Sequence, residues 1–425
     1  MTDIVSPGHA ALDSRLALYP LTYVNEGDQI IIGRSDVDSF AVFSADAAGL
    51  VRRLATGEDL AAAGAWYLAA HGEPADLGDL VAVLRELDFV IPAGPPVPRP
   101  AGASQPPLAG GPVRWQRLGR AALSPVALSG YAAGVAVAVY LMMTTPALRP
   151  GPSTVFFSRS LLVVLGVTLG AQAVGVTWHE AFHVLAGRRI GLPSRLSVGR
   201  RLYFVVIQTT LTGLMGLPAR RRILPFCAGL IADAVAVSVL IGLADAGRLA
   251  GWPSWLGRTA VGLAYLTILR MLWQAMFFME TDLCHVLASL LRCPDLHKMT
   301  REYLRNRYAR LRERALGRPP LGPAIDESGW SARDTKIARR YAPFVLLGSA
   351  LLIGSAVFTS VPVLAGLAIR VYRGVVSGDL LTARFWDSAV AGGVMVAQFA
   401  VVAVIKIHDR RLRQQTAVRS AIPGA

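Results

Sequence analysis

Residues 161–187 read LLVVLGVTLGAQAVGVTWHEAFHVLAG, and the interpretation of the whole chain starts from them. No charged residue occurs between Leu161 and Trp178. An apolar helix of about 20 residues is long enough to cross the hydrocarbon core of a bilayer. His179, Glu180 and His183 follow at the end of this apolar run. Because ionisable side chains are costly inside a membrane, we expect these three residues to have a function.

The spacing of the two histidines indicates what that function is. His179 and His183 are four residues apart, so in a helix their imidazoles lie on one face. Two imidazoles placed in this way can bind one divalent metal ion, and Glu180 between them can take a proton from a water molecule that the metal activates. The alternative is a pair of packed histidines that hydrogen-bond to their neighbours, and the membrane setting favours the metal site.

The composition is that of a membrane protein. The chain is 53% hydrophobic and 17% charged, which is too apolar for a soluble protein of this length. Its long apolar runs predict a multi-pass α-helical membrane protein of about six spans, with a small N-terminal α/β winged-helix-like cytosolic domain. The expected spans are residues 126–146, 161–187, 223–244, 259–280, 346–368 and 385–405.

The chain divides into three parts. Residues 1–92 are expected to form the N-terminal domain, here called the head, residues 93–112 a proline-rich linker, and residues 113–425 the membrane part. No signal peptide is recognised at the start. The head is expected to contain two strands, three helices and a closing strand. The expected head elements are strands at 29–33 and 39–43, helices at about 45–55, 58–70 and from Asp76, and the closing strand Phe89–Ile91.

The runs Asp38–Phe43 and Leu84–Val90, with Leu54 between them, resemble PqqD-like domains. Those domains recognise the leader peptides of ribosomally made, modified peptides. The resemblance implies that a leader peptide binds the head, where it would add a strand to an exposed sheet edge. A regulatory or dimerising winged helix is the alternative.

Charge is distributed unevenly along the chain. Residues 1–100 carry 14 acidic and 6 basic residues, and the remainder carries 14 acidic and 37 basic ones. An acidic head does not suit DNA, so we expect no nucleic-acid partner. The basic remainder suits anionic lipids, and the basic helix expected at 296–316 would lie on their surface. By the positive-inside rule, the basic loops 188–222 and 281–342 place both chain ends on the cytoplasmic side of the plasma membrane.

A third metal ligand is expected from the fourth span. Residues 259–291 are apolar for too long to form one straight span, so we expect a break near Thr281 and Asp282, one of which would cap a new helix. This break lies at the depth of the two histidines. A catalytic zinc site needs three protein ligands and one open position. Asp282 is the predicted third ligand, His285 one turn further on is the second choice, and a purely capping role for Asp282 is the alternative.

Two further features concern the same region. Asp233 and Arg270 are expected at equal depth, and since each charge alone would be costly, we predict that they pair. A structural brace is the expected role of this pair, and substrate binding is the alternative. Residues 195–212 alternate weakly and predict either a hairpin whose edge holds an extended substrate beside the metal, or an interfacial loop.

Taken together, the pentad in a span, the basic loop after it, the run Ala228–Asp233 and the distant Asp282 resemble site-2 protease-like membrane zinc metallopeptidases. The nearest branch is that of the putative peptide zinc metalloproteases with a PqqD-like head. The resemblance implies that His179, His183 and Asp282 bind one zinc ion and that Glu180 is the catalytic base. Two positions depart from the family pattern: Leu283 follows Asp282 where a glycine is usual, and Asp233 stands where many members have asparagine.

The leading hypothesis is therefore a zinc metalloendopeptidase that cleaves a peptide or a membrane-anchored protein near the cytoplasmic face, in the maturation of a ribosomally made peptide. One alternative is a non-hydrolytic membrane protein that binds or exports a peptide. Another is an ion transporter that uses Glu180, Asp233, Arg270 and Asp282 as a polar path. The substrate itself is not evident from the sequence.

Overall fold

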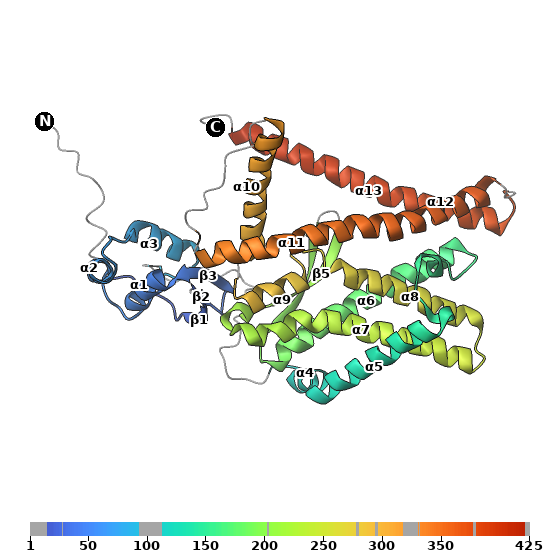
Figure 1. The fold of residues 1–425 in the computed structure, drawn as a ribbon, viewed down its shortest axis with the longest axis horizontal. Helices are drawn as coiled ribbons and strands as arrows, with labels where there is room; N and C mark the ends of the chain where they lie inside the picture. Colours follow the sequence, from blue (N-terminus) through green and yellow to red (C-terminus); the bar gives the residue numbers. More distant parts are fainter. Residues whose placement is uncertain are drawn as a thin grey trace.

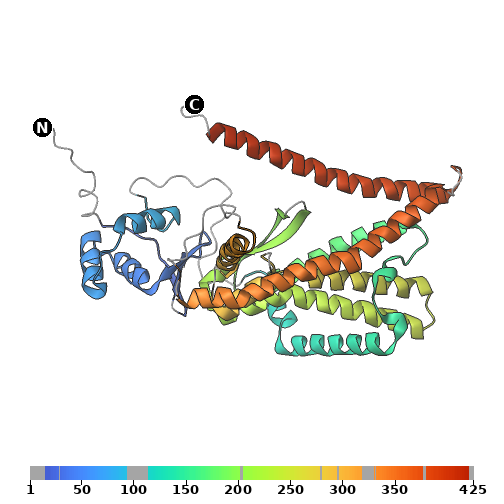
Figure 2. The ribbon, with the colours of Figure 1, turned by 45° about the horizontal axis from the view of Figure 1, so that its top comes forward.

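The chain is mostly helical, with a small sheet near its N-terminus (Figures 1 and 2). Several long helices in the middle of the chain run side by side, whereas the helix at 296–316 stands across them and the last helix diverges from them. The computed structural model describes residues 15–27, 29–92, 113–201, 204–277, 280–293, 296–317, 330, 332–376 and 380–420. The predicted linker at 93–112 lies outside the described residues.

The head contains a three-stranded antiparallel sheet followed by three helices. Its elements are β1 (Thr22–Glu26), β2 (Gln29–Arg34), β3 (Ser39–Ser44), α1 (Ala45–Ala55), α2 (Leu60–His71) and α3 (Leu77–Glu86). Each helix begins after a residue whose side chain accepts a hydrogen bond from the first turn, Ser44, Asp59 and Asp76 in order, and such caps satisfy backbone groups that the helix leaves unpaired. The core of the head is apolar, with Ile32, Leu54, Leu84 and Phe89 almost fully buried.

Two expectations about the head need correction. β1 was not predicted, because its sequence TYVNE is short and half polar. The closing strand at Phe89–Ile91 is not a strand: Val90 and Leu18 form an isolated bridge, with two backbone hydrogen bonds beside it. A proline follows each of the two paired segments: Pro20 comes after Leu18, and Pro92 comes after Val90. Because proline has no backbone N–H to donate to a neighbouring strand, the pairing stays short.

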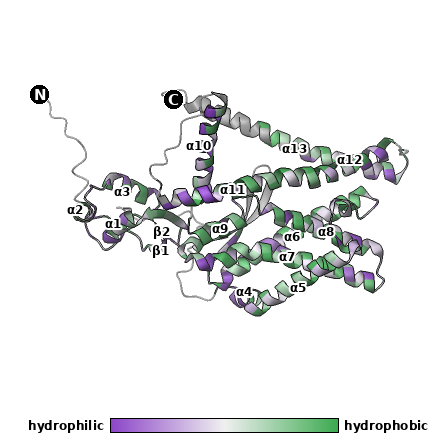
Figure 3. Cartoon of the chain, viewed as in Figure 1, coloured by the Kyte–Doolittle hydropathy of each residue, from purple (hydrophilic) through white to green (hydrophobic). Residues whose placement is uncertain are grey.

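Among the described residues, five helical stretches are long and apolar enough to cross a membrane, where about six were expected. They are Pro125–Thr144 (α5), Leu161–Arg189 (α6), Ala219–Leu249 (α7), Thr335–Val376 and Ala383–Ile405 within α13 (Ala383–Ser420). The fourth of these combines α11 (Ala332–Ser355), a π-helical turn Ala356–Ser360 and α12 (Val361–Val376). Figure 3 shows apolar residues along most of their length.

The span expected at 259–280 is the one that differs. A helix is present there, α8 (Ser254–Trp273), but it ends before residue 280 and is not among the five. Its 20 residues include Arg258 and Arg270, which make it less apolar than the others. The break expected near Thr281 is present, and a separate helix, α9 (Asp282–Leu291), follows it.

Helix α7 is the centre of the membrane part. It packs against α5, α6, α8 and α9. Small residues make this close packing possible: Ala228 and Ala232 of α7 are fully buried against Phe182 and Ala186 of α6. The start of α6 is held by α13, because the Asp387 carboxylate accepts hydrogen bonds from the backbone N–H of Leu161 (2.7 Å) and from the hydroxyl of the capping Ser160 (2.5 Å).

Two further elements extend from the bundle. The strands β4 (Ser194–Arg201) and β5 (Phe204–Leu211) form the expected antiparallel hairpin, which packs on α6. The expected basic helix is α10 (Leu296–Leu316). Its apolar residues Tyr308 and Leu311 are exposed, 61% and 53%.

The head contacts the membrane part through a buried ion pair. Glu26 Oε1 of β1 lies 2.8 Å from Arg222 Nη2 of α7, and both side chains are at most 2% exposed. Arg222 also donates to the backbone carbonyls of Leu217 (2.7 Å) and Met215 (3.0 Å). Since Asp38 accepts from the N–H of Gly213 at 2.7 Å, the segment 213–217 joins the head to the first turn of α7.

Replacing Arg222 by methionine is expected to destabilise the protein by about 3–5 kcal/mol, because Glu26 would stay buried without its positive partner. The double variant Glu26→Gln/Arg222→Met should recover much of this loss. Unfolding in detergent micelles measures both. Arg248→Met on the same helix is the control, since its pair with Asp245 is half exposed and should contribute less than about 1 kcal/mol. Equal losses for Arg222→Met and Arg248→Met would contradict the prediction.

Candidate metal centre

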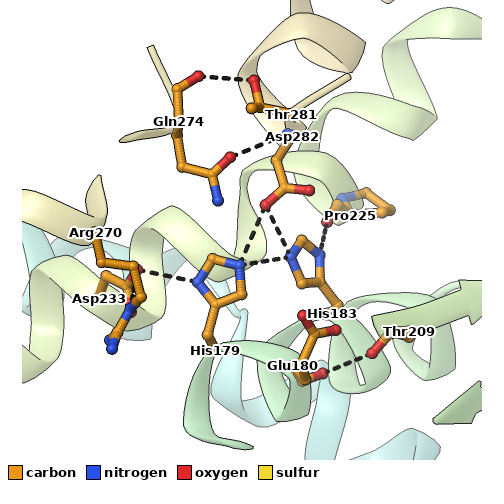
Figure 4. Close-up of polar contacts among 10 residues, drawn as sticks. All are labelled: His179, Glu180, His183, Thr209, Pro225, Asp233, Arg270, Gln274, Thr281 and Asp282. Carbon is orange, nitrogen blue, oxygen red and sulfur yellow. Dashed lines mark hydrogen bonds and ion pairs between the residues drawn. The ribbon is translucent and has the colours of Figure 1, made fainter. Parts of the chain in front are cut away.

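Three side chains expected to bind a metal meet in the bundle core, although Asp282 is far from the histidines in sequence (Figure 4). The Oδ2 atom of Asp282 is 3.2 Å from His179 Nε2 and 3.3 Å from His183 Nε2. The two Nε2 atoms are 3.3 Å apart. Both histidines are buried, and the Asp282 side chain is 25% exposed, so the cluster is accessible at Asp282.

The partner of the other ring nitrogen, Nδ1, determines which nitrogen of each histidine carries the hydrogen. His179 Nδ1 lies 3.0 Å from Oδ2 of Asp233, and His183 Nδ1 lies 2.8 Å from the backbone carbonyl oxygen of Pro225. A carboxylate and a carbonyl oxygen only accept hydrogen bonds, so each Nδ1 is the donor. A neutral imidazole has one N–H, and in that form both Nε2 atoms carry lone pairs.

With neutral rings, the two Nε2 atoms and Asp282 Oδ2 would face one another as three lone-pair atoms. Their repulsion is removed by a positive charge between them, either a metal ion or a proton on one Nε2. Zinc binds histidine nitrogen and aspartate oxygen at about 2.0–2.2 Å, and tetrahedral ligands at those distances are about 3.3 Å from each other. The observed separations of 3.2, 3.3 and 3.3 Å match this value, so the donor set fits zinc with a fourth position left open.

Asp282 is held in place by the residues before it. It is the first residue of α9, and its backbone N–H donates to the side-chain oxygen of Gln274 at 3.1 Å. The Thr281 hydroxyl donates to the backbone carbonyl of Gln274 at 2.8 Å. The cap position of α9 is Thr281, which makes no side-chain capping hydrogen bond, so a purely capping role for Asp282 is not what the structure shows. The Asp282 carboxylate reaches both imidazoles instead.

Gly229 of α7 makes room for the cluster. A Cβ atom at this position would lie 2.2 Å from His179 Nε2 and 2.5 Å from His183 Nε2. Real Cβ atoms do not approach other atoms so closely, and the crowded atoms are the proposed ligands themselves. The helix that supplies the Pro225 carbonyl therefore also needs a glycine at the position that faces the two imidazoles.

The expected pairing of Asp233 with Arg270 is present. Arg270 donates from Nη2 to Asp233 Oδ1 at 2.6 Å and from Nε to Oδ2 at 3.2 Å, and Asp233 is fully buried. Nη1 of Arg270 donates to the side-chain oxygen of Gln172 at 2.8 Å. The pair is not isolated, because Oδ2 of Asp233 also accepts from His179.

Glu180 and His285 occupy different surroundings. In Figure 4 the Glu180 carboxylate rises from the same side of α6 as the two imidazoles, and its backbone carbonyl accepts from the Thr209 hydroxyl of β5 at 3.3 Å. His285, the second choice for the third ligand, is not part of the cluster. Its ring stacks on Phe226 with a centroid distance of 5.1 Å.

Sequence reasoning missed Pro225, Gly229, Gln274 and Gln172. Backbone carbonyls carry no sequence signal, so the role of Pro225 was not predictable. The run Ala228–Asp233 was recognised only through a resemblance, although its glycine indicates close approach of another group.

Comparison with models of known protein families, with characterised proteins and with solved structures finds no match to this chain.

Gly229→Ala is expected to abolish stoichiometric zinc binding, because the new methyl group would occupy the space of the ligand nitrogens. Gly242→Ala on the same helix is the control: nothing lies within 4 Å of a Cβ there, and alanine favours a helix by roughly 0.5–1 kcal/mol. Zinc content of the two purified variants measures the effect. Wild-type zinc content in a folded Gly229→Ala variant would show that the metal does not lie between these rings.

Proposed function

We propose that this chain is a multi-pass membrane zinc metallopeptidase that hydrolyses a bond in a peptide or membrane-anchored protein. The observation that carries the proposal is the close approach of His179 Nε2, His183 Nε2 and Asp282 Oδ2, with each histidine Nδ1 next to another accepting oxygen. A structural zinc site is closed by four protein ligands, whereas a catalytic one has three and an open position. The described cluster has three and is accessible at Asp282.

Each residue has a defined part in the reaction. His179, His183 and Asp282 would hold zinc, which when bound polarises the carbonyl of the scissile bond and makes water a stronger nucleophile at neutral pH. Glu180 accepts the proton of the attacking water on its carboxylate and passes it to the leaving amine. Glu180 directly follows His179 on α6, and its carboxylate would have to reach the attacking water from there.

The site would lie near the cytoplasmic face of the plasma membrane. Five apolar helices support a membrane location, and the basic loops 188–222 and 281–342 favour the cytoplasm for that end of the bundle and for both termini. The hairpin β4–β5 packs on α6, and Thr209 of β5 contacts the backbone of Glu180. An extended substrate paired with this hairpin would run close to the catalytic carboxylate.

The head would bind the leader of a ribosomally made peptide. Its three-stranded sheet has β1 and β3 as edges, and strand addition needs such an edge. Segment 213–217 connects the head to α7, the helix that carries Gly229. A leader bound there would bring its own precursor near the metal centre, which supports a role in peptide maturation.

Glu180→Gln is expected to lower peptide hydrolysis by about 10²–10⁴-fold, the usual contribution of a general base, with zinc content unchanged because Glu180 is not a ligand. The full chain in lipid bilayers is incubated with a random decapeptide library, and mass spectrometry counts the new termini.

The matched variant is Asp282→Asn, which should lose both zinc and hydrolysis. Undiminished hydrolysis by Glu180→Gln would refute the role of this carboxylate. Zinc binding without hydrolysis in the wild-type protein, with peptides retained, would favour the non-hydrolytic alternative.

A further inference from the structure

The Asp233 carboxylate is shared between two groups of different kinds. On one side, Arg270 donates to both of its oxygens, at 2.6 and 3.2 Å. On the other side, His179 Nδ1 lies 3.0 Å from Oδ2. A structural brace between α7 and α8 would need only the contact between Asp233 and Arg270. The contact with His179 links this pair to a side chain of the candidate metal centre.

We infer that Asp233 is a positioning residue of the metal centre: it holds the hydrogen of His179 on Nδ1 and so presents Nε2 to the metal. The inference rests on the proposed zinc site. Hydrogen bonds from a ligating histidine to a carboxylate fix both the tautomer and the ring orientation, and their loss typically lowers metal affinity 10–100-fold. His183 has the same arrangement with the carbonyl of Pro225 in place of a carboxylate.

The contact with Arg270 explains why an aspartate suits position 233 and an asparagine does not. An asparagine has one accepting oxygen and one donating NH₂ group. With Arg270 donating to both ends of the residue-233 side chain, the asparagine oxygen would turn towards the guanidinium. Its NH₂ would then face His179 Nδ1 and favour the hydrogen on Nε2, the nitrogen that the metal needs.

Arg270 is itself confined. Nη1 donates to Gln172 at 2.8 Å, and a Cβ on Gly175 would lie 2.7 Å from the same atom. Gln172, Gly175 and His179 all lie on α6. The guanidinium therefore crosses the surface of the helix that carries the metal ligand, and the three side chains Arg270, Asp233 and His179 form one chain of contacts.

The test compares two double variants that both lack the buried charges, Asp233→Asn/Arg270→Met and Asp233→Leu/Arg270→Met. Replacing both partners of a buried ion pair by neutral side chains of similar size is often tolerated. Without Arg270, the asparagine oxygen is free to accept from His179, whereas leucine offers no acceptor. We expect the asparagine variant to bind zinc about 10–100-fold more tightly than the leucine variant.

Zinc affinity is measured on the full chain in detergent by competition with a chelator, and the absorption spectrum of the Co²⁺-substituted protein reports the ligand geometry. The single variant Asp233→Asn should bind zinc less tightly than Asp233→Asn/Arg270→Met. Asp387→Asn is the control, since it loosens the other end of α6, and it should leave zinc affinity unchanged.

Equal zinc affinities and Co²⁺ spectra for the two double variants would overturn the inference and leave Asp233 as a brace. Failure of the proposed function is seen in the wild-type protein itself, which would then either bind no zinc or bind zinc without hydrolysing peptides.

Discussion

The structure depends on three atoms of metal-ligand type, two imidazole nitrogens and a carboxylate oxygen, which helices far apart in sequence hold within 3.3 Å of one another. Their mutual repulsion has to be offset by the packing around them or by a cation. Helix α7 supplies much of that packing: the Pro225 carbonyl holds one imidazole, Asp233 holds the other, and Gly229 leaves the space between. Helix α9 adds the third atom at its first residue, where Gln274 holds its backbone.

Much of the candidate site was predictable because its signals are local. The four-residue spacing of His179 and His183 places both on one face of α6, and the excessive length of the apolar run 259–291 predicts the break before α9. The Asp233–Arg270 contact followed from charge and depth alone. The partners of the Nδ1 atoms were not predictable, because a backbone carbonyl has no sequence signature and because Asp233 was expected to contact Arg270 alone.

Some elements of the fold match their predictions, and others do not. The hairpin at 194–211, the basic helix α10 and the three head helices correspond to expected elements. Five of the about six expected spans are long and apolar enough among the described residues; α8 is not, because it carries Arg258 and Arg270 and ends at Trp273. Arg270 has a reason to be there, since it neutralises the buried carboxylate that holds His179. The residue that weakens the span pattern is thus part of the site.

X-ray absorption at the zinc edge of the purified full chain tests the central claim most directly. The account predicts one zinc per chain, with two imidazole nitrogens and oxygen ligands at about 2.0–2.2 Å. A protein that takes up no zinc, or a zinc shell without imidazole, would contradict it.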